Sequence, residues 1–221
     1  MALSSSGADV AVGIVASAGG PQALIRLCPL LSFTFPVPVF IIQHIHPRFT
    51  TLLVTRLREL TGLPVHLAQD GEIVEVGVIY VAPGDQHMQV QKSSQGVRIR
   101  LSRGLLRHGV SSSADFLFES MAETYGGGAV AVVLTGMGRD GTEGARRVVS
   151  EGGQVLAQAV ESCLIPGMVL SLREGDVPHH SVPLSEMGEA IGAAVLRALR
   201  GMGYRGGKGR SSASPLTSRG I

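Results

Sequence analysis

Residues 9–21 read DVAVGIVASAGGP, and the interpretation of the whole chain starts from this stretch. Its first half is a short apolar run rich in valine and isoleucine, which is typical of a buried strand. Pro21 suits the first turn of a helix, where the missing N–H of proline costs nothing. Ser17 therefore lies on a tight turn between a predicted strand and a predicted helix. Its hydroxyl either caps that helix or is presented for chemistry.

Strand-like runs alternate with helix-like segments over most of the chain. After the opening unit, a second buried strand is predicted at residues 37–43 and a helix at residues 49–60. The alternation continues with helix 112–125, strand 129–135, helix 142–151, strand 154–159 and helix 185–200. It predicts an α/β fold, doubly wound, with a mostly parallel sheet and helices on both faces.

Residues 64–101 break this alternation. Four short apolar runs are separated by turn signals such as Asp70-Gly71 and Pro83-Gly84, and no helix fits between them. This pattern predicts an antiparallel hairpin at one edge of the sheet.

The length of 221 residues and a hydrophobic content of 44% predict one sizeable domain, at residues 10–200. Residues 1–9 are expected to be a flexible N-terminus and residues 201–221 a basic flexible tail. From Arg197 onward there are six basic residues and no acidic one, whereas the preceding 196 residues hold 13 basic and 17 acidic groups. The predicted domain thus lacks the basic character of a nucleic-acid partner. No apolar run reaches the roughly 18 residues of a transmembrane segment.

Three polar residues follow three of the predicted strands. Ser17 follows the first strand, His44 follows the strand at 37–43, and Asp140 lies in the turn after the strand at 129–135. Parallel strands end at one edge of an open sheet, so these side chains are expected to lie together. A serine, a histidine and an aspartate form the set that acyl transfer requires. Each alone is more often structural, and the rival histidines are His46, His87, His179 and His180.

Residues 136–141, GMGRDG, also match the G-x-G-x-x-G pattern of dinucleotide-binding turns, with Glu161 about 20 residues further on. This makes dinucleotide binding an alternative. Against it, Asp140 would place a carboxylate where a pyrophosphate should dock. No P-loop motif is present, and the pairs His44/His46 and His179/His180 are too sparse for a predicted metal site. We therefore expect neither a metal nor a cofactor.

The chain resembles the catalytic domain of the CheB family of chemotaxis receptor methylesterases. Five segments carry the resemblance, in the family's order: GIVASAGGPQAL, FIIQHIHPRFT, VIYVAPGDQH, AVVLTGMGRDGTEGA and ESCLIPGM. It implies that Ser17 is the nucleophile, His44 the base and Asp140 its partner. It also implies oxyanion or substrate contacts at Ala18, Gly19 and Met137. The implied reaction is hydrolysis of glutamyl methyl esters on the cytoplasmic helices of chemoreceptors, which releases methanol, and many members also deamidate receptor glutamines.

The resemblance further implies a cytoplasmic protein whose partner is the methylated receptor. Ala18 stands where many members have threonine, and residues 111–115, SSSAD, replace the usual R-P-S-V-D. These departures keep a non-catalytic binding module of the same fold as a second alternative. Because about nine residues precede the first strand, we expect no receiver domain within this chain, and a separate regulator is possible.

Overall fold

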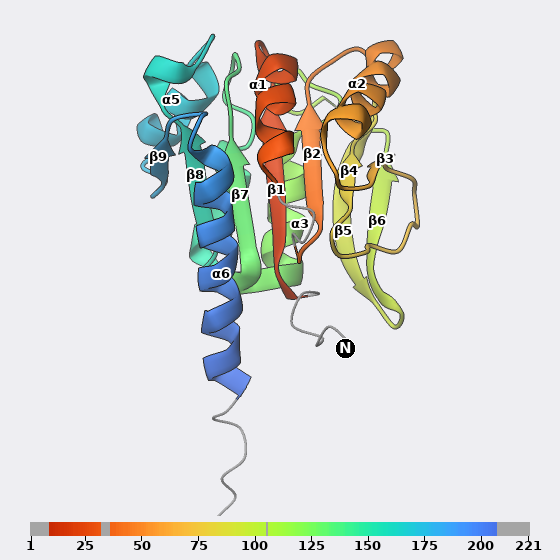
Figure 1. Cartoon of the computed structure of the whole chain (residues 1–221), viewed down its shortest axis with the longest axis vertical. Helices are drawn as coiled ribbons and strands as arrows, with labels where there is room; N and C mark the ends of the chain where they lie inside the picture. The colour runs from red at the N-terminus through yellow and green to blue at the C-terminus, as the bar shows by residue number, and fades with distance from the viewer. Residues whose placement is uncertain (1–8, 32–35, 105, 207–221) are drawn as a thin grey trace, which may run out of the picture.

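The structure is a computed structural model that describes residues 9–31, 36–104 and 106–206 (Figure 1). Its strands are β1 (Ala11–Ala16), β2 (Val39–Gln43), β3 (Val65–Leu67), β4 (Ile79–Val81), β5 (His87–Ser93), β6 (Gly96–Ser102), β7 (Ala129–Val133), β8 (Gln154–Gln158) and β9 (His180–Val182). Its α-helices are α1 (Gly20–Leu27), α2 (Pro47–Leu60), α3 (Ala114–Tyr125), α4 (Thr142–Ser150), α5 (Gly167–Glu174) and α6 (Met187–Gly206). Helices and strands alternate along most of the chain, as the hydrophobic pattern predicts.

Seven strands form one parallel sheet in the order β3-β4-β2-β1-β7-β8-β9. The strand β1 lies in the middle, between β2 and β7 (Figure 1). From β1 the chain builds outward through β2 on one side, and later through β7 and β8 on the other. The carboxyl end of β1 is therefore the switch point of the sheet, which is where open α/β sheets bind ligands.

The two faces of the sheet bury separate cores. Val12 and Ile14 of β1 pack with apolar residues of α1, α2 and α6, whereas Ala11 and Val15 pack with those of α3, α4 and α5. Alternate side chains of a strand point to opposite faces, so a strand covered on both sides must be apolar throughout. All six residues of β1 are buried. The doubly wound α/β prediction is confirmed.

The predicted antiparallel hairpin is present as β5 and β6, but it forms a two-stranded sheet of its own. It packs on the α3 side of the molecule, where Val90 N–H donates to Ser120 Oγ of α3 at 3.0 Å. The earlier strands, β3 and β4, instead join the main sheet in parallel. Their connection needs no helix because its amides bond to β6, for example Gly71 N–H to Ile99 O at 2.8 Å.

Two helix ends differ from the prediction. The capping residue of α3 is Ser113 rather than Ser112, and its hydroxyl accepts from Asp115 N–H. Helix α6 continues to Gly206 instead of ending near Arg200, since glycine inside a helix costs only about 1 kcal/mol. The rest of the predicted tail, 207–221, and residues 1–8 lie outside the described residues. Across the described ranges, no helix is long and apolar enough to cross a membrane.

Candidate active site

Ser17 follows β1 on a turn that the neighbouring strands hold in place. Its N–H donates to Thr135 O at 3.0 Å, and its carbonyl accepts from Gly20 N–H at 2.8 Å and from Gln43 Nε2 at 3.0 Å. The cap of α1 is Gly19, in the left-handed conformation with φ of 79°. Ser17 therefore does not cap the helix, and its half-buried hydroxyl makes no hydrogen bond within the described part of the chain.

His44 follows β2 directly beside Ser17. The register pairs Ala16 with Gln43, and His44 N–H donates to Ala16 O at 3.0 Å. The side-chain amide of Gln43 donates to the carbonyls of both Ser17 and His44, at 3.0 and 3.1 Å. One buried glutamine thus connects the two turns, and the sequence interpretation did not identify it.

Asp140 lies in the turn after β7, where 3% of its surface is exposed. Its Oδ2 accepts from His44 Nε2 at 2.8 Å and from Ala114 N–H at 2.7 Å. Its Oδ1 accepts from Ser113 Oγ at 2.5 Å and from Asp115 N–H at 3.4 Å. Burial acts to raise the pKa of Asp140, but the hydrogen bonds from His44, Ser113 and Ala114 outweigh it and hold the pKa below its usual value.

The pair His44–Asp140 leaves one imidazole nitrogen for a reaction. Because Nε2 bonds the carboxylate, Nδ1 is the atom that can take up a proton. No hydrogen bond joins the Ser17 hydroxyl to the His44 ring in the described residues. Catalytic hydrogen bonds are often long before substrate binds, so adjacency at the strand ends is the relevant geometry. The structure thus brings the three predicted residues to one edge, and their catalytic roles remain a prediction.

The predicted oxyanion residues lie in the two turns that follow β1 and β7. Ala18 is exposed and 75% of Met137 is exposed. Among the described residues, neither the Ala18 N–H nor the Met137 N–H donates a hydrogen bond. Thr135 Oγ1 connects the first of these turns to the segment before α5, since it bonds Ala18 O at 3.0 Å and Ile165 O at 3.1 Å. The two N–H groups are thus available to an incoming oxygen.

The second turn is tightly packed against the first. A Cβ atom added to Gly136 would lie 2.7 Å from the Ser17 Cβ and 2.2 Å from the Met168 sulfur. Real side chains never approach this closely, so only glycine fits at this position.

The rings of three rival histidines contact other groups, and the fourth, His180, is exposed. His46 is the cap of α2, where its Nδ1 accepts from Arg48 N–H at 3.4 Å. His87 is buried and its Nδ1 accepts from Ser113 N–H at 3.1 Å. The ring of His179 bonds the Val177 carbonyl at 2.7 Å, and His180 begins β9. None of the four bonds Asp140.

The geometry of the turn between β7 and α4, residues 136–141, disfavours a dinucleotide. Gly144 N–H, in the first turn of α4, donates to the Asp115 carboxylate at 2.8 Å. The buried carboxylates of Asp115 and Asp140 both lie at this helix end, where they would repel a pyrophosphate. No cluster of three or more His, Cys, Asp or Glu side chains that could hold a metal occurs among the residues that the structure describes.

Comparisons with known proteins agree on one family. A family model described as CheB methylesterase matches residues 12–191. A protein-glutamate methylesterase/protein-glutamine glutaminase of Archaeoglobus fulgidus is 40% identical over 160 residues, which is 72% of this chain and 46% of that protein. The corresponding protein of Thermotoga maritima is 37% identical over 186 residues, 84% of this chain and 54% of that one. The chain therefore spans about half the length of the curated relatives that it matches.

A solved structure matches over almost its whole length. The crystal structure of the Thermotoga maritima CheB methylesterase catalytic domain aligns with a TM-score of 0.80 and 35% identity. The alignment covers 86% of this chain and 97% of that structure.

Proposed function

Because this chain belongs to the CheB methylesterase family, we propose that it hydrolyses glutamyl methyl esters on the cytoplasmic helices of chemoreceptors. The names of its relatives also include glutaminase, and we extend the proposal to deamidation of receptor glutamines. The activity would lie in the cytoplasm, where those helices are. The observation that carries the proposal is the 2.8 Å bond between His44 and the buried Asp140, at the carboxyl edge beside Ser17.

In the proposed reaction, Ser17 Oγ attacks the ester carbonyl carbon while His44 Nδ1 takes the hydroxyl proton. Asp140 accepts the Nε2–H bond and stabilises the imidazolium that forms. His44 then gives the proton to the leaving oxygen, the C–O bond breaks, and methanol departs from an acyl-serine. Water repeats the sequence, which frees the glutamate and restores the Ser17 hydroxyl. An amide substrate follows the same steps and releases ammonia.

The oxyanion of the tetrahedral intermediate would be held by backbone N–H groups. Those of Ala18 and Met137 support this role because both are free of other bonds in the described structure. Neither donor depends on the side chain of its residue, so alanine in place of threonine at position 18 leaves the proposed hole intact. Losing one such donor typically lowers turnover roughly 10²–10³-fold.

The direct test is Ser17→Ala, with Ser150→Ala as the matched control on the exposed end of α4. We expect methanol release from a methylated receptor fragment to disappear in the first variant and to persist in the second. The thermal unfolding midpoints of both should stay within a few degrees of the wild type. Undiminished methanol release by Ser17→Ala would reject the assignment.

A second assay separates the esterase from a non-catalytic binding module of the same fold. A serine-directed phosphonate reacts only with an activated hydroxyl. We expect a single label on Ser17 in the wild type and none in Ser17→Ala. An unlabelled wild type that still binds the receptor fragment would favour the binding module.

A further inference from the structure

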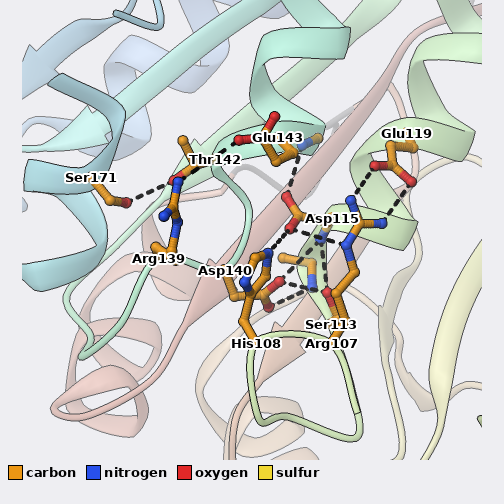
Figure 2. A network of polar contacts seen from close by, with 12 residues as sticks. Arg107, His108, Ser113, Asp115, Glu119, Arg139, Asp140, Thr142, Glu143 and Ser171 are labelled. Atoms are coloured by element: carbon orange, nitrogen blue, oxygen red, sulfur yellow. Dashed lines mark hydrogen bonds and ion pairs between the residues drawn. The ribbon is translucent and has the colours of Figure 1, made fainter. Parts of the chain in front are cut away.

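Next to the candidate site, two acidic side chains accept hydrogen bonds from the N-terminal N–H groups of helices other than the ones they adjoin. Asp140 lies two residues before the start of α4, yet its carboxylate accepts from the first N–H groups of α3, at Ala114 and Asp115. Asp115 lies in the first turn of α3, yet its carboxylate accepts from Gly144 N–H of α4 at 2.8 Å. Asp140 thus bonds N–H groups at the start of α3, and Asp115 bonds one at the start of α4. The two carboxylates lie between the two helix ends (Figure 2).

The Asp115 carboxylate also contacts two side chains from the loop before α3, His108 and Arg107. Its Oδ2 contacts His108 Nε2 at 3.0 Å and Arg107 Nε at 3.5 Å. Arg107 in turn donates two bonds to the Glu119 carboxylate, at 2.7 and 2.9 Å (Figure 2). The Asp115 side chain is completely buried, whereas those of His108 and Arg107 are about one-quarter exposed.

We propose that Asp115 is a positioning residue of the active site: its buried carboxylate, at the helix ends beside Asp140, acts on His44 through its negative charge. The inference rests on the proposed function, since His44 is taken as the base. The residues form a path of contacts. Arg107 and His108 contact the Asp115 carboxylate, the Asp115 N–H donates to Asp140, and Asp140 accepts from His44. No member of this path before Asp140 touches the reacting atoms.

Helix capping alone does not explain a carboxylate at position 115. An asparagine would also accept from Gly144 N–H, through a weaker neutral bond, without placing a second buried charge beside Asp140. Burial raises the pKa of Asp115, and the Asp140 charge raises it further, while the Gly144 bond, Arg107 and His108 lower it. The arrangement therefore has an electrostatic cost, which two cationic or proton-donating partners offset. Asp115 adds negative charge behind Asp140, and negative charge near His44 stabilises the imidazolium.

The test measures the pKa of the His44 ring by NMR titration in the full chain, with the resonance assigned from its loss in His44→Gln. Asp115→Asn keeps an acceptor for Gly144 N–H and removes one negative charge, so the pKa of His44 should fall by roughly 0.5–1 unit. Arg107→Gln removes a positive charge from the same path without touching either helix cap, so the pKa should rise.

The ion pair Arg56–Glu59 on α2 supplies matched controls, because both side chains are more than half exposed. Glu59→Gln and Arg56→Gln remove the same charges and should leave the pKa of His44 unchanged.

The opposite signs distinguish an electrostatic role from a structural one. A loosened loop would lower kcat in both variants without moving the His44 titration in two directions. Shifts no larger than those of the controls, or shifts of the same sign, would overturn the proposal. If Asp115→Asn does not fold, Arg107→Gln alone decides. The titration needs no substrate, so a wild type without esterase activity would contradict the proposed function and leave this measurement valid.

Discussion

The two turns that carry Ser17 and Asp140 share one backbone design but treat their polar side chains in opposite ways. Both lead from a central strand into a helix, and both have a left-handed glycine as the helix cap, Gly19 and Gly141. In the first turn only the backbone of Ser17 is bonded, and its hydroxyl makes no bond within the described residues. In the second turn the Asp140 carboxylate accepts from four donors.

This difference follows the work proposed for each group. A nucleophile has to bond both the base and the substrate during the reaction, so its hydroxyl must not be held by a competing partner. The acid must hold an imidazole in one orientation throughout, so its rotation has to be prevented beforehand. The backbone supplies the position in both turns, and only the acid has its side chain fixed as well.

After loss of the nucleophile itself, the largest expected effect comes from removing the charge of the fixed acid. Asp140→Asn preserves the size of the side chain but offers His44 an amide, which favours the wrong tautomer. We expect kcat for methanol release to fall roughly 10³–10⁴-fold. Asp176→Asn, on an exposed residue with φ of 51°, is the control and should retain full activity. A fall of less than tenfold in Asp140→Asn would show that the acid is dispensable.

A smaller effect is expected where the two turns touch. Gly136→Ala forces a Cβ into the space of the Ser17 Cβ and the Met168 sulfur, so the turns must move apart. Such overpacking typically lowers the free energy of unfolding by about 1–3 kcal/mol, and a displaced nucleophile should cost at least about tenfold in kcat. Gly192→Ala, in α6 with open space around it, should be neutral or slightly stabilising. Urea unfolding and methanol release measure both quantities, and a fully active Gly136→Ala would mean that the contact does not position Ser17.

A still smaller effect, on stability, is expected from removing a hydrogen-bond donor to the Asp140 carboxylate. Ser113→Ala removes the donor to Asp140 Oδ1 and the cap of α3, so the free energy of unfolding should fall by about 0.5–2 kcal/mol. Ser111→Ala, in the same loop, should change it by less than about 0.5 kcal/mol. Equal stabilities of the two variants in urea would argue that the Ser113 hydroxyl is not part of the support.

The smallest effect concerns pH. The pKa of Asp140 is lowered in the folded state, so its contribution to stability is present above the pKa of the unfolded chain and is lost as the pH falls through the folded value. The stability difference between wild type and Asp140→Asn should therefore shrink in acid. The pKa of Asp115 is raised, so for Asp115→Asn the difference should change with pH in the opposite direction. Urea unfolding at pH 7, 5 and 3 measures both, and parallel curves would contradict the assigned directions.

The sequence was sufficient for those parts of the site that follow strand ends. Ser17, His44 and Asp140 each come directly after a buried apolar run, and the parallel topology brings such positions to one edge. The same reasoning predicted the two-sided sheet and its helices. It did not require any knowledge of which side chains contact each other.

The support of the acid could not be predicted in this way. Asp115 pairs with Gly144 across 29 positions, and the sequence shows it only as a residue in the first turn of a helix. His108 lies in a loop without periodicity, where nothing indicates a contact with a buried carboxylate. The parallel pairing of β3 and β4 was missed for a similar reason, because the bonds that replace a crossover helix come from the distant strand β6.

The amide of Gln43, which donates to the carbonyls of Ser17 and His44, has a consequence for how the protein responds to heat. It ties the backbones of the two turns that carry the nucleophile and the base to one side chain. Helices sliding over the sheet would not separate those turns. On warming, the two turns should therefore stay together until the sheet that carries them unfolds.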